Sequence, residues 1–134
     1  MLALEARRMG YYTHILDPQA NGPAAQVAEC HTAAALNDPR AAARLAAQCD
    51  VITLEWELIP APILEKIESL KPLAPSSKVL KLIQDRLTQK EFLASLNLPQ
   101  APYASVDDSL GLAAAAKGVG FPCILKRRSS GYDG

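Results

Sequence analysis

Asp50-Val51-Ile52-Thr53-Leu54-Glu55 is the stretch that decides the fold of this chain. Its centre, residues 51–54, is a short continuous run of apolar and β-branched residues, which is typical of a strand buried on both faces. Further extended segments are predicted on either side of it, over residues 11–16 and 73–75. Helical patterns separate these segments, so strands alternate with helices from residue 11 to about residue 75. That order predicts βαβ units and an α/β fold with a parallel sheet.

The helical segments carry local start and stop signals. Asp38 and Pro39 predict an N-cap and a first turn, after which Ala42 and Leu45 fall on one face. Gly10 closes the first helix, as glycine commonly does just past a helix C-terminus. Helices are predicted over residues 2–9, 24–27, 39–46, 60–67, 76–83, 85–96 and 109–118.

The character of the chain changes near residues 76–102, where helical patterns lead into a proline-rich linker. We therefore expect an α/β domain over residues 1–75, a helical connector over 76–102, and the beginning of a second domain over 103–134. Within that last part, residues 103–106 and 121–126 are predicted strands. The chain starts in a helix without an N-cap and stops in a glycine loop, so we expect it to be a piece of a larger protein.

Composition excludes several classes of protein. A formal charge of +0, with 49% hydrophobic and 21% charged residues, argues against a disordered chain and lacks the basicity of a nucleic-acid binder. No apolar run of about 18 residues predicts a membrane span, and charges near the N-terminus argue against a secretory signal, so we expect a cytoplasmic protein. The 3 cysteines show no CxxC spacing, and we interpret them, with His14 and His31, as structural residues.

Charge is divided unevenly along the chain. Residues 1–67 hold 5 basic and 8 acidic side chains, whereas residues 68–134 hold 9 and 6. Lys126, Arg127 and Arg128 end a predicted strand and precede a loop with Gly131 and Gly134. Glycines let backbone N–H groups approach phosphate oxygens, and a strand-anchored lysine adds a fixed charge. The pattern indicates either a nucleotide-phosphate cradle or a solvated basic strand end.

Two other stretches could carry chemistry. Glu55 follows the strand at residues 51–54, and ligands of open α/β sheets bind outside the carboxyl ends of strands. The alternative is a helix-start carboxylate that favours the helix dipole before Pro60. Arg86 and Lys90 lie four residues apart on one helix face, which would suit a polyphosphate but is also typical of a solvated charged face.

Taken together, these stretches resemble the ATP-grasp enzymes, and among them the family of N5-carboxyaminoimidazole ribonucleotide synthetases of purine biosynthesis. The order and separation of the motifs fit this family over nearly the whole chain. The matching residues are 7–11, Asp17-Pro18 with Pro23-Ala24, 50–55, Asp85-Arg86-Leu87-Thr88-Gln89-Lys90, Lys126-Arg127-Arg128 and Gly131-Tyr132-Asp133-Gly134. The implied fold is a Rossmann-like, pre-ATP-grasp parallel sheet that lacks its first strand, followed by the start of an ATP-grasp domain.

The resemblance also implies site residues. Arg86 and Lys126 correspond to residues that contact ATP phosphates, and the loop Gly131-Tyr132-Asp133-Gly134 corresponds to the one that covers the nucleotide. Tyr132 and Asp133 would lie toward the ribonucleotide, and Glu55 would contact aminoimidazole ribonucleotide. Ser130 stands where the family commonly has glycine, which makes the loop less free to adopt a positive φ.

The implied reaction uses ATP, bicarbonate and aminoimidazole ribonucleotide as substrates and Mg²⁺ as cofactor, with the metal ligands expected outside this chain. We expect a homodimer for the full-length protein, and no turnover from these 134 residues alone. No catalytic residue is assigned, and no partner among nucleic acids or membranes is expected. The alternative is a non-catalytic Rossmann-like binding or interaction module with an incidental basic tail.

Overall fold

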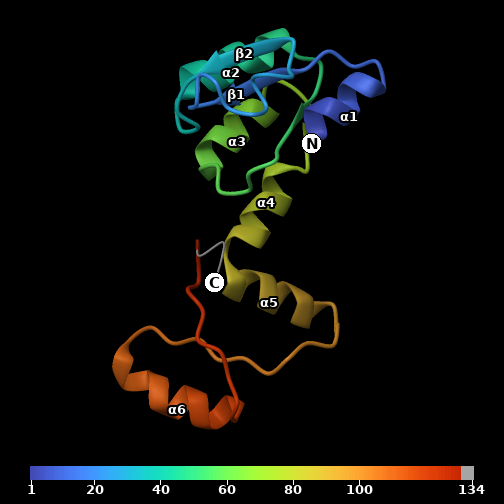
Figure 1. Cartoon of the computed structure of the whole chain (residues 1–134). Helices are drawn as coiled ribbons and strands as arrows, with labels where there is room; N and C mark the ends of the chain where they lie inside the picture. The colour runs from blue at the N-terminus through green and yellow to red at the C-terminus, as the bar shows by residue number, and fades with distance from the viewer. Residues whose placement is uncertain (131–134) are drawn as a thin grey trace. The chain divides into compact units, whose positions relative to one another are not determined.

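A computed structural model describes residues 1–130 of the chain (Figure 1). It holds two compact units, Met1–Leu80 and Lys81–Gly134, whose boundary falls within helix α4. The first unit contains α1 (Leu2–Arg8), β1 (His14–Asp17), β2 (Cys30–Ala33), α2 (Pro39–Gln48), β3 (Ile52–Thr53), α3 (Ala61–Glu68), β4 (Leu73–Ala74) and the start of α4 (Ser77–Gln84). The second unit continues with α5 (Arg86–Ser95) and α6 (Ser109–Val119). No helix within residues 1–130 is long and apolar enough to cross a membrane.

The strands form two separate parallel pairs. In the first pair His14 of β1 lies opposite Cys30 of β2, and in the second Ile52 of β3 lies opposite Leu73 of β4. This confirms the α/β class and the parallel pairing. The expectation of one continuous sheet is not met over residues 1–130, because no ladder joins the two pairs.

The strand at residues 51–54 is shorter and less buried than predicted. Ile52 is buried, but Val51 is 58% exposed and Thr53 is also exposed. A strand is buried on both faces only where layers cover both sides of its sheet. In this pair only the side chains that face the helices gain that cover, so the prediction of two-sided burial is wrong.

Two other predictions for the first unit are wrong. Residues 24–27 form hydrogen-bonded turns rather than a helix, with Val27 N and Ala28 N both donating to the carbonyl of Ala24. The strand β2 was not predicted, because residues 30–33 lack the alternation of apolar and polar side chains that is typical of a strand. The strand forms because β1 pairs with its backbone in parallel. The turns are part of the crossover that connects the two parallel strands.

The predicted helix signals are confirmed in the geometry. Asp38 caps α2, its Oδ1 accepting from Arg40 N at 2.8 Å and from Ala41 N at 3.2 Å. Asp108 caps α6 in the same way, accepting from Gly111 N at 2.9 Å. Side-chain oxygens at these positions satisfy backbone donors that the helix itself leaves unpaired.

The core of the first unit lies where α2 and α3 pack on each other and on the strands. Buried side chains of α2, β3, α3, β4 and α4, with one from the loop before α3, form one cluster of Ala42, Leu45, Ile52, Ile59, Ile63, Leu64, Ile67, Leu73 and Leu80. The link from α3 to α4 is polar, because the Ser77 hydroxyl and N–H both donate to the Glu68 carboxylate. The predicted face of α2, with Ala42 and Leu45, therefore lies in the core, together with the buried residues of α3.

The second unit has little buried surface among its described residues. Neither α5 nor α6 contains a buried residue. The strands predicted over residues 103–106 and 121–126 are absent, and Phe121, Ile124 and Leu125 are between 69% and 81% exposed. A strand needs a partner to satisfy its backbone groups, and residues 81–130 supply none.

Candidate functional site

The N-terminus of α5 is set by Asp85. Its Oδ1 accepts from Leu87 N at 3.0 Å and from Thr88 N at 2.9 Å, which makes it the N-cap. The Thr88 N–H lowers the pKa of the Asp85 carboxyl most, and the hydrogen bond and positive charge of Arg128 lower it further. Asp85 is therefore an anion at neutral pH, with its second oxygen turned to another part of the chain.

The second oxygen of Asp85 faces residues 126–130, here called the basic segment, which lies against the start of α5. Arg128 Nε donates to Asp85 Oδ2 at 2.6 Å across 43 positions of sequence. The Arg86 backbone N–H donates to the carbonyl of Arg128 at 2.9 Å. Arg86 Nη1 donates to the carbonyls of Arg127 at 3.0 Å and Ser130 at 2.8 Å. The two basic motifs of the sequence are thus joined in one cluster.

Lys90, the second basic residue of the α5 motif, turns to other partners. Its Nζ lies 3.4 Å from the carbonyl of Ala101 and 5.4 Å from the centre of the Tyr103 ring. The linker also contacts this helix through Gln100, whose Nε2 donates to the carbonyl of Lys90 at 2.9 Å. Arg86 and Lys90 therefore contact different parts of the chain, and Lys90 holds the linker to α5.

Lys126 and Arg127 are exposed at the start of the basic segment. They belong to no strand, which corrects the predicted strand context of Lys126. Ser130 has a φ of 61°, the left-handed region that residues with a side chain seldom adopt. The remaining predicted residues of this loop, Gly131, Tyr132, Asp133 and Gly134, lie outside the described residues.

Glu55 belongs to the first unit. It lies two residues after the end of β3, and its side chain is exposed. The neighbouring Trp56 is 45% exposed. Glu55 therefore stands at the carboxyl end of a parallel strand, where ligands of α/β sheets bind.

The described residues offer few groups for metal binding or thiol chemistry. Within residues 1–130 no cluster of three or more histidine, cysteine, aspartate or glutamate side chains could hold a metal ion. Cys30, Cys49 and Cys123 are all free thiols. Burial raises the pKa of the Cys49 thiol, which disfavours the reactive thiolate.

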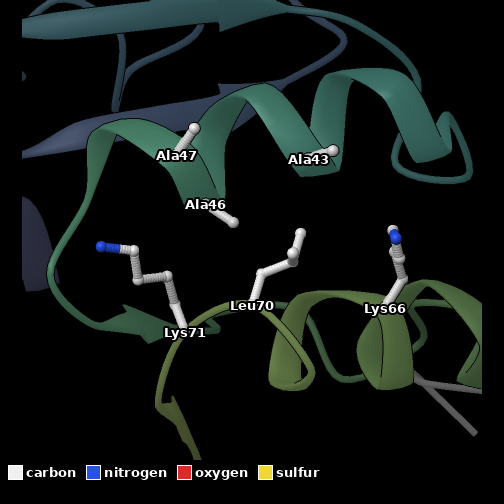
Figure 2. Close-up of a pocket in the computed structure, with 6 residues that line it drawn as sticks. All are labelled: Ala43, Ala46, Ala47, Lys66, Leu70 and Lys71. Carbon is white, nitrogen blue, oxygen red and sulfur yellow. The ribbon is translucent and has the colours of Figure 1, made fainter.

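A groove between α2 and the end of α3 was not predicted from the sequence (Figure 2). Its volume is about 320 Å³, and its lining residues are Ala43, Ala46, Ala47, Lys66, Leu70 and Lys71. In Figure 2, Leu70 rises toward the alanines of α2, with the two lysines on either side. None of the six is an acid, a histidine or a cysteine, so Lys66 and Lys71 are the ionisable groups of its lining.

Asp85 belongs to the motif of residues 85–90 identified in the sequence, but the predicted ligand contact of that motif was Arg86. The position of Asp85 just before the helix was a visible signal, because an aspartate N-cap has one carboxylate oxygen left over after capping. Which cation that oxygen meets depends on residues 43 positions away.

Comparison with known proteins adds to this geometry. The chain is 46% identical over all 134 residues to N5-carboxyaminoimidazole ribonucleotide synthase of Brucella melitensis, and spans 37% of that protein's length. A crystal structure of an N5-carboxyaminoimidazole ribonucleotide synthetase with ADP matches 99% of the chain at a TM-score of 0.93 and 37% identity, which is 35% of that structure's chain.

A third similarity is to the N5-carboxyaminoimidazole synthase of Aspergillus clavatus in complex with ADP and 5-aminoimidazole ribonucleotide. It covers 90% of the chain and 33% of that structure's chain, at a TM-score of 0.79 and 28% identity. Residues 1–84, more than half of the chain, match the family model of the ribonucleotide synthetase preATP-grasp domain. The chain therefore belongs to the ribonucleotide synthetase preATP-grasp domain family.

Proposed function

We propose that the chain is the amino-terminal part of an ATP-dependent carboxylating ligase of purine biosynthesis. The ligase converts 5-aminoimidazole ribonucleotide, bicarbonate and ATP to N5-carboxyaminoimidazole ribonucleotide, ADP and phosphate. The observation that carries the proposal is 46% identity along the whole chain to a synthase of that name. Because the chain spans 37% of that relative, the activity is proposed for a longer protein that contains it.

The chemistry has two steps. A bicarbonate oxygen attacks the γ-phosphorus of ATP, which forms carboxyphosphate and releases ADP. The exocyclic amine of the ribonucleotide then attacks the carboxyl carbon, and phosphate leaves as the nitrogen loses a proton. Positioning of the reactants and stabilisation of phosphoryl charge are what such a reaction needs from a protein.

We assign Lys126 and Arg86 to the phosphates of ATP and the loop Gly131, Tyr132, Asp133 and Gly134 to the cover of the nucleotide. The packing of the basic segment against the start of α5 supports this assignment, because Arg86 bonds to the carbonyls of residues 127 and 130 and so lies beside the segment that carries Lys126. Tyr132 and Asp133 are also assigned to the ribonucleotide side.

Glu55 is assigned to aminoimidazole ribonucleotide. Its place at the carboxyl end of β3 supports this role, because a carboxylate there can accept from a ribose hydroxyl or an amine. The relative crystallised with ADP and 5-aminoimidazole ribonucleotide supports the substrate class.

The remaining parts of the proposal concern the whole protein. Residues 1–130 offer no cluster of metal ligands, so no step is assigned to Mg²⁺ here, and the ligands are expected elsewhere in the longer chain. A further strand between β1 and β3 would join the two parallel pairs into one Rossmann-like sheet. Residues 1–75 would form that domain, 76–102 a connector, and 103–134 the start of the ATP-grasp domain. We also propose a cytoplasmic homodimer.

The test is phosphate release from ATP by the longer protein. Release should require bicarbonate and aminoimidazole ribonucleotide together, and absence of any such dependence would overturn the proposal.

The Lys126→Ala variant tests the assignment of the phosphate site. Loss of a charge-assisted hydrogen bond should raise the KM for ATP about tenfold to a hundredfold. Lys117→Ala, at an exposed lysine of α6, is the matched control and should leave the KM unchanged. An unchanged ATP dependence in the Lys126 variant would mean that this lysine is a solvated surface residue.

A further inference from the structure

The attachment of the basic segment to α5 depends on one carboxylate. Asp85 uses Oδ1 to cap the helix and Oδ2 to bind Arg128, so the helix start and the segment share a single side chain. The bond from Arg128 Nε to Oδ2, at 2.6 Å, is shorter than the two capping bonds and joins two opposite charges. The capping oxygen keeps this carboxylate in a fixed place at the helix end.

Main-chain atoms of the segment are held next to this ion pair. Three carbonyls of the segment accept hydrogen bonds from Arg86. Its backbone N–H donates to the carbonyl of residue 128, and its guanidinium donates to the carbonyls of residues 127 and 130. Ser130 holds its left-handed conformation with its carbonyl bonded to Arg86 at 2.8 Å. The path of the chain from Arg127 to Ser130 is therefore set by the first residues of α5.

Lys126 precedes the first of these anchored carbonyls and has an exposed side chain. Anchoring of Arg127 fixes the backbone next to Lys126 while the ammonium group faces solvent. A lysine held in this way loses less conformational entropy when it binds an anion.

The ion pair itself contributes little to global stability. The Arg128 side chain is 57% exposed and that of Asp85 is 29% exposed, and exposed pairs are screened by water and salt. Its effect is local, so variants of either residue should still fold.

We propose that Asp85 and Arg128 act as a positioning clamp that holds the basic segment, residues 126–130, on α5 and so presents Lys126 to the phosphates of the nucleotide. The proposal rests on the function proposed above and adds to it two residues that act through Lys126 rather than on the substrate.

Limited trypsin digestion of the 134-residue chain tests the clamp without reference to activity. Lys126, Arg127 and Arg128 are the trypsin sites within the segment, and release of the segment should make its backbone accessible to the protease. Because Arg128→Gln removes the third site, cleavage is compared after Lys126 and Arg127. Asp85→Asn keeps a good N-cap but removes the charge, and Arg128→Gln removes the other partner. Cleavage after Lys126 and Arg127 should become about fivefold faster in both.

Asp108→Asn is the matched control, because Asp108 caps α6 and accepts from Gly111 as Asp85 accepts from Thr88. It should leave the cleavage rate unchanged. Equal cleavage in wild type, Asp85→Asn and Arg128→Gln would overturn the clamp.

Kinetics of the longer protein test the positioning role. Each variant should raise the KM for ATP about fivefold and change kcat by less than about twofold, and the double variant should be no worse than either single one. Faster cleavage with an unchanged KM, or additive effects in the double variant, would overturn the positioning role. If the wild type lacks ribonucleotide-dependent ATP hydrolysis, the proposed function fails, whereas the digestion result still decides whether the clamp exists.

Discussion

At the scale of single residues, polar side chains around β1 and β2 form hydrogen bonds with backbone and hydroxyl groups. His14 Nε2 lies 2.8 Å from Thr32 Oγ1, and His31 Nε2 lies 3.2 Å from the carbonyl of Asp17. Glu29 accepts from the N–H and hydroxyl of Thr13, both at 2.8 Å. These contacts agree with the interpretation of both histidines as structural residues.

His14 should make stability depend on pH. Burial lowers its pKa below 6.5, and the charge of His31 lowers it further. The unfolded chain then binds more protons than the folded one, so the free energy of unfolding falls as the pH drops through about 6.5. Urea unfolding at pH 7.5 and 5.5 should show this loss, and His14→Gln should show a smaller one.

The carboxylates act in a different pH range. The pKa of Glu29 is lowered below 4.5, mainly by the Thr13 N–H, so its contribution is present above that value and lost only in more acidic solution. It therefore does not overlap with the His14 window. A His14 titration midpoint at or above 6.5, measured by NMR, would contradict the prediction.

At the scale of elements, α1 shows how a helix end is determined locally. Gly10 has a φ of 87°, and its N–H donates to the carbonyl of Arg7 at 3.0 Å. The N–H of Tyr11 donates to the carbonyl of Ala6, also at 3.0 Å. These two bonds form a Schellman motif, which needs a residue that tolerates the left-handed conformation.

Gly10→Ala should therefore destabilise the end of α1. No atom lies within 4 Å of an added Cβ, so the cost is conformational and amounts to about 1 kcal/mol. Hydrogen exchange of the Tyr11 amide measures it directly. Gly10→Asn is the control and should cost less, because asparagine tolerates this region better than alanine. Equal exchange rates in wild type and Gly10→Ala would show that the motif does not stabilise the helix.

At the scale of the whole molecule, the buried core and the proposed phosphate site belong to different units. The first unit contains the buried cluster, in which Leu64 is fully buried and Leu80 is 2% exposed. In the second unit, the described helices contain no buried residue, and the basic segment is held by polar contacts instead.

Leu64→Ala should consequently weaken the first unit as a whole. Removal of a fully buried leucine costs about 2–5 kcal/mol through lost transfer energy and the cavity left behind. Fluorescence of Trp56, the single tryptophan, reports the urea transition of this unit. Leu70→Ala, at a leucine 46% exposed, is the control and should cost less than about 1 kcal/mol. Similar losses in the two variants would mean that the cluster is not the stabilising core.

The sequence by itself predicted the helices other than the one at residues 24–27, which did not form, and it supplied the candidate site residues. Starts at Asp38, Asp85 and Asp108 follow from hydrogen bonds within four residues, so they are visible locally. Helix faces that build the core follow from the 3.6-residue period. Arg86 and Lys126 were identified because their motifs are contiguous.

Only the tertiary structure decided which strands form and which charges meet. A strand forms where a distant segment completes its hydrogen bonds. For that reason β2 formed although the sequence did not predict it, and the strands predicted at 103–106 and 121–126 did not form. The contact of Asp85 with Arg128 spans 43 positions, beyond the reach of any local pattern. Local bonds can be inferred from neighbouring residues, whereas pairing across the chain depends on the fold that brings the partners together.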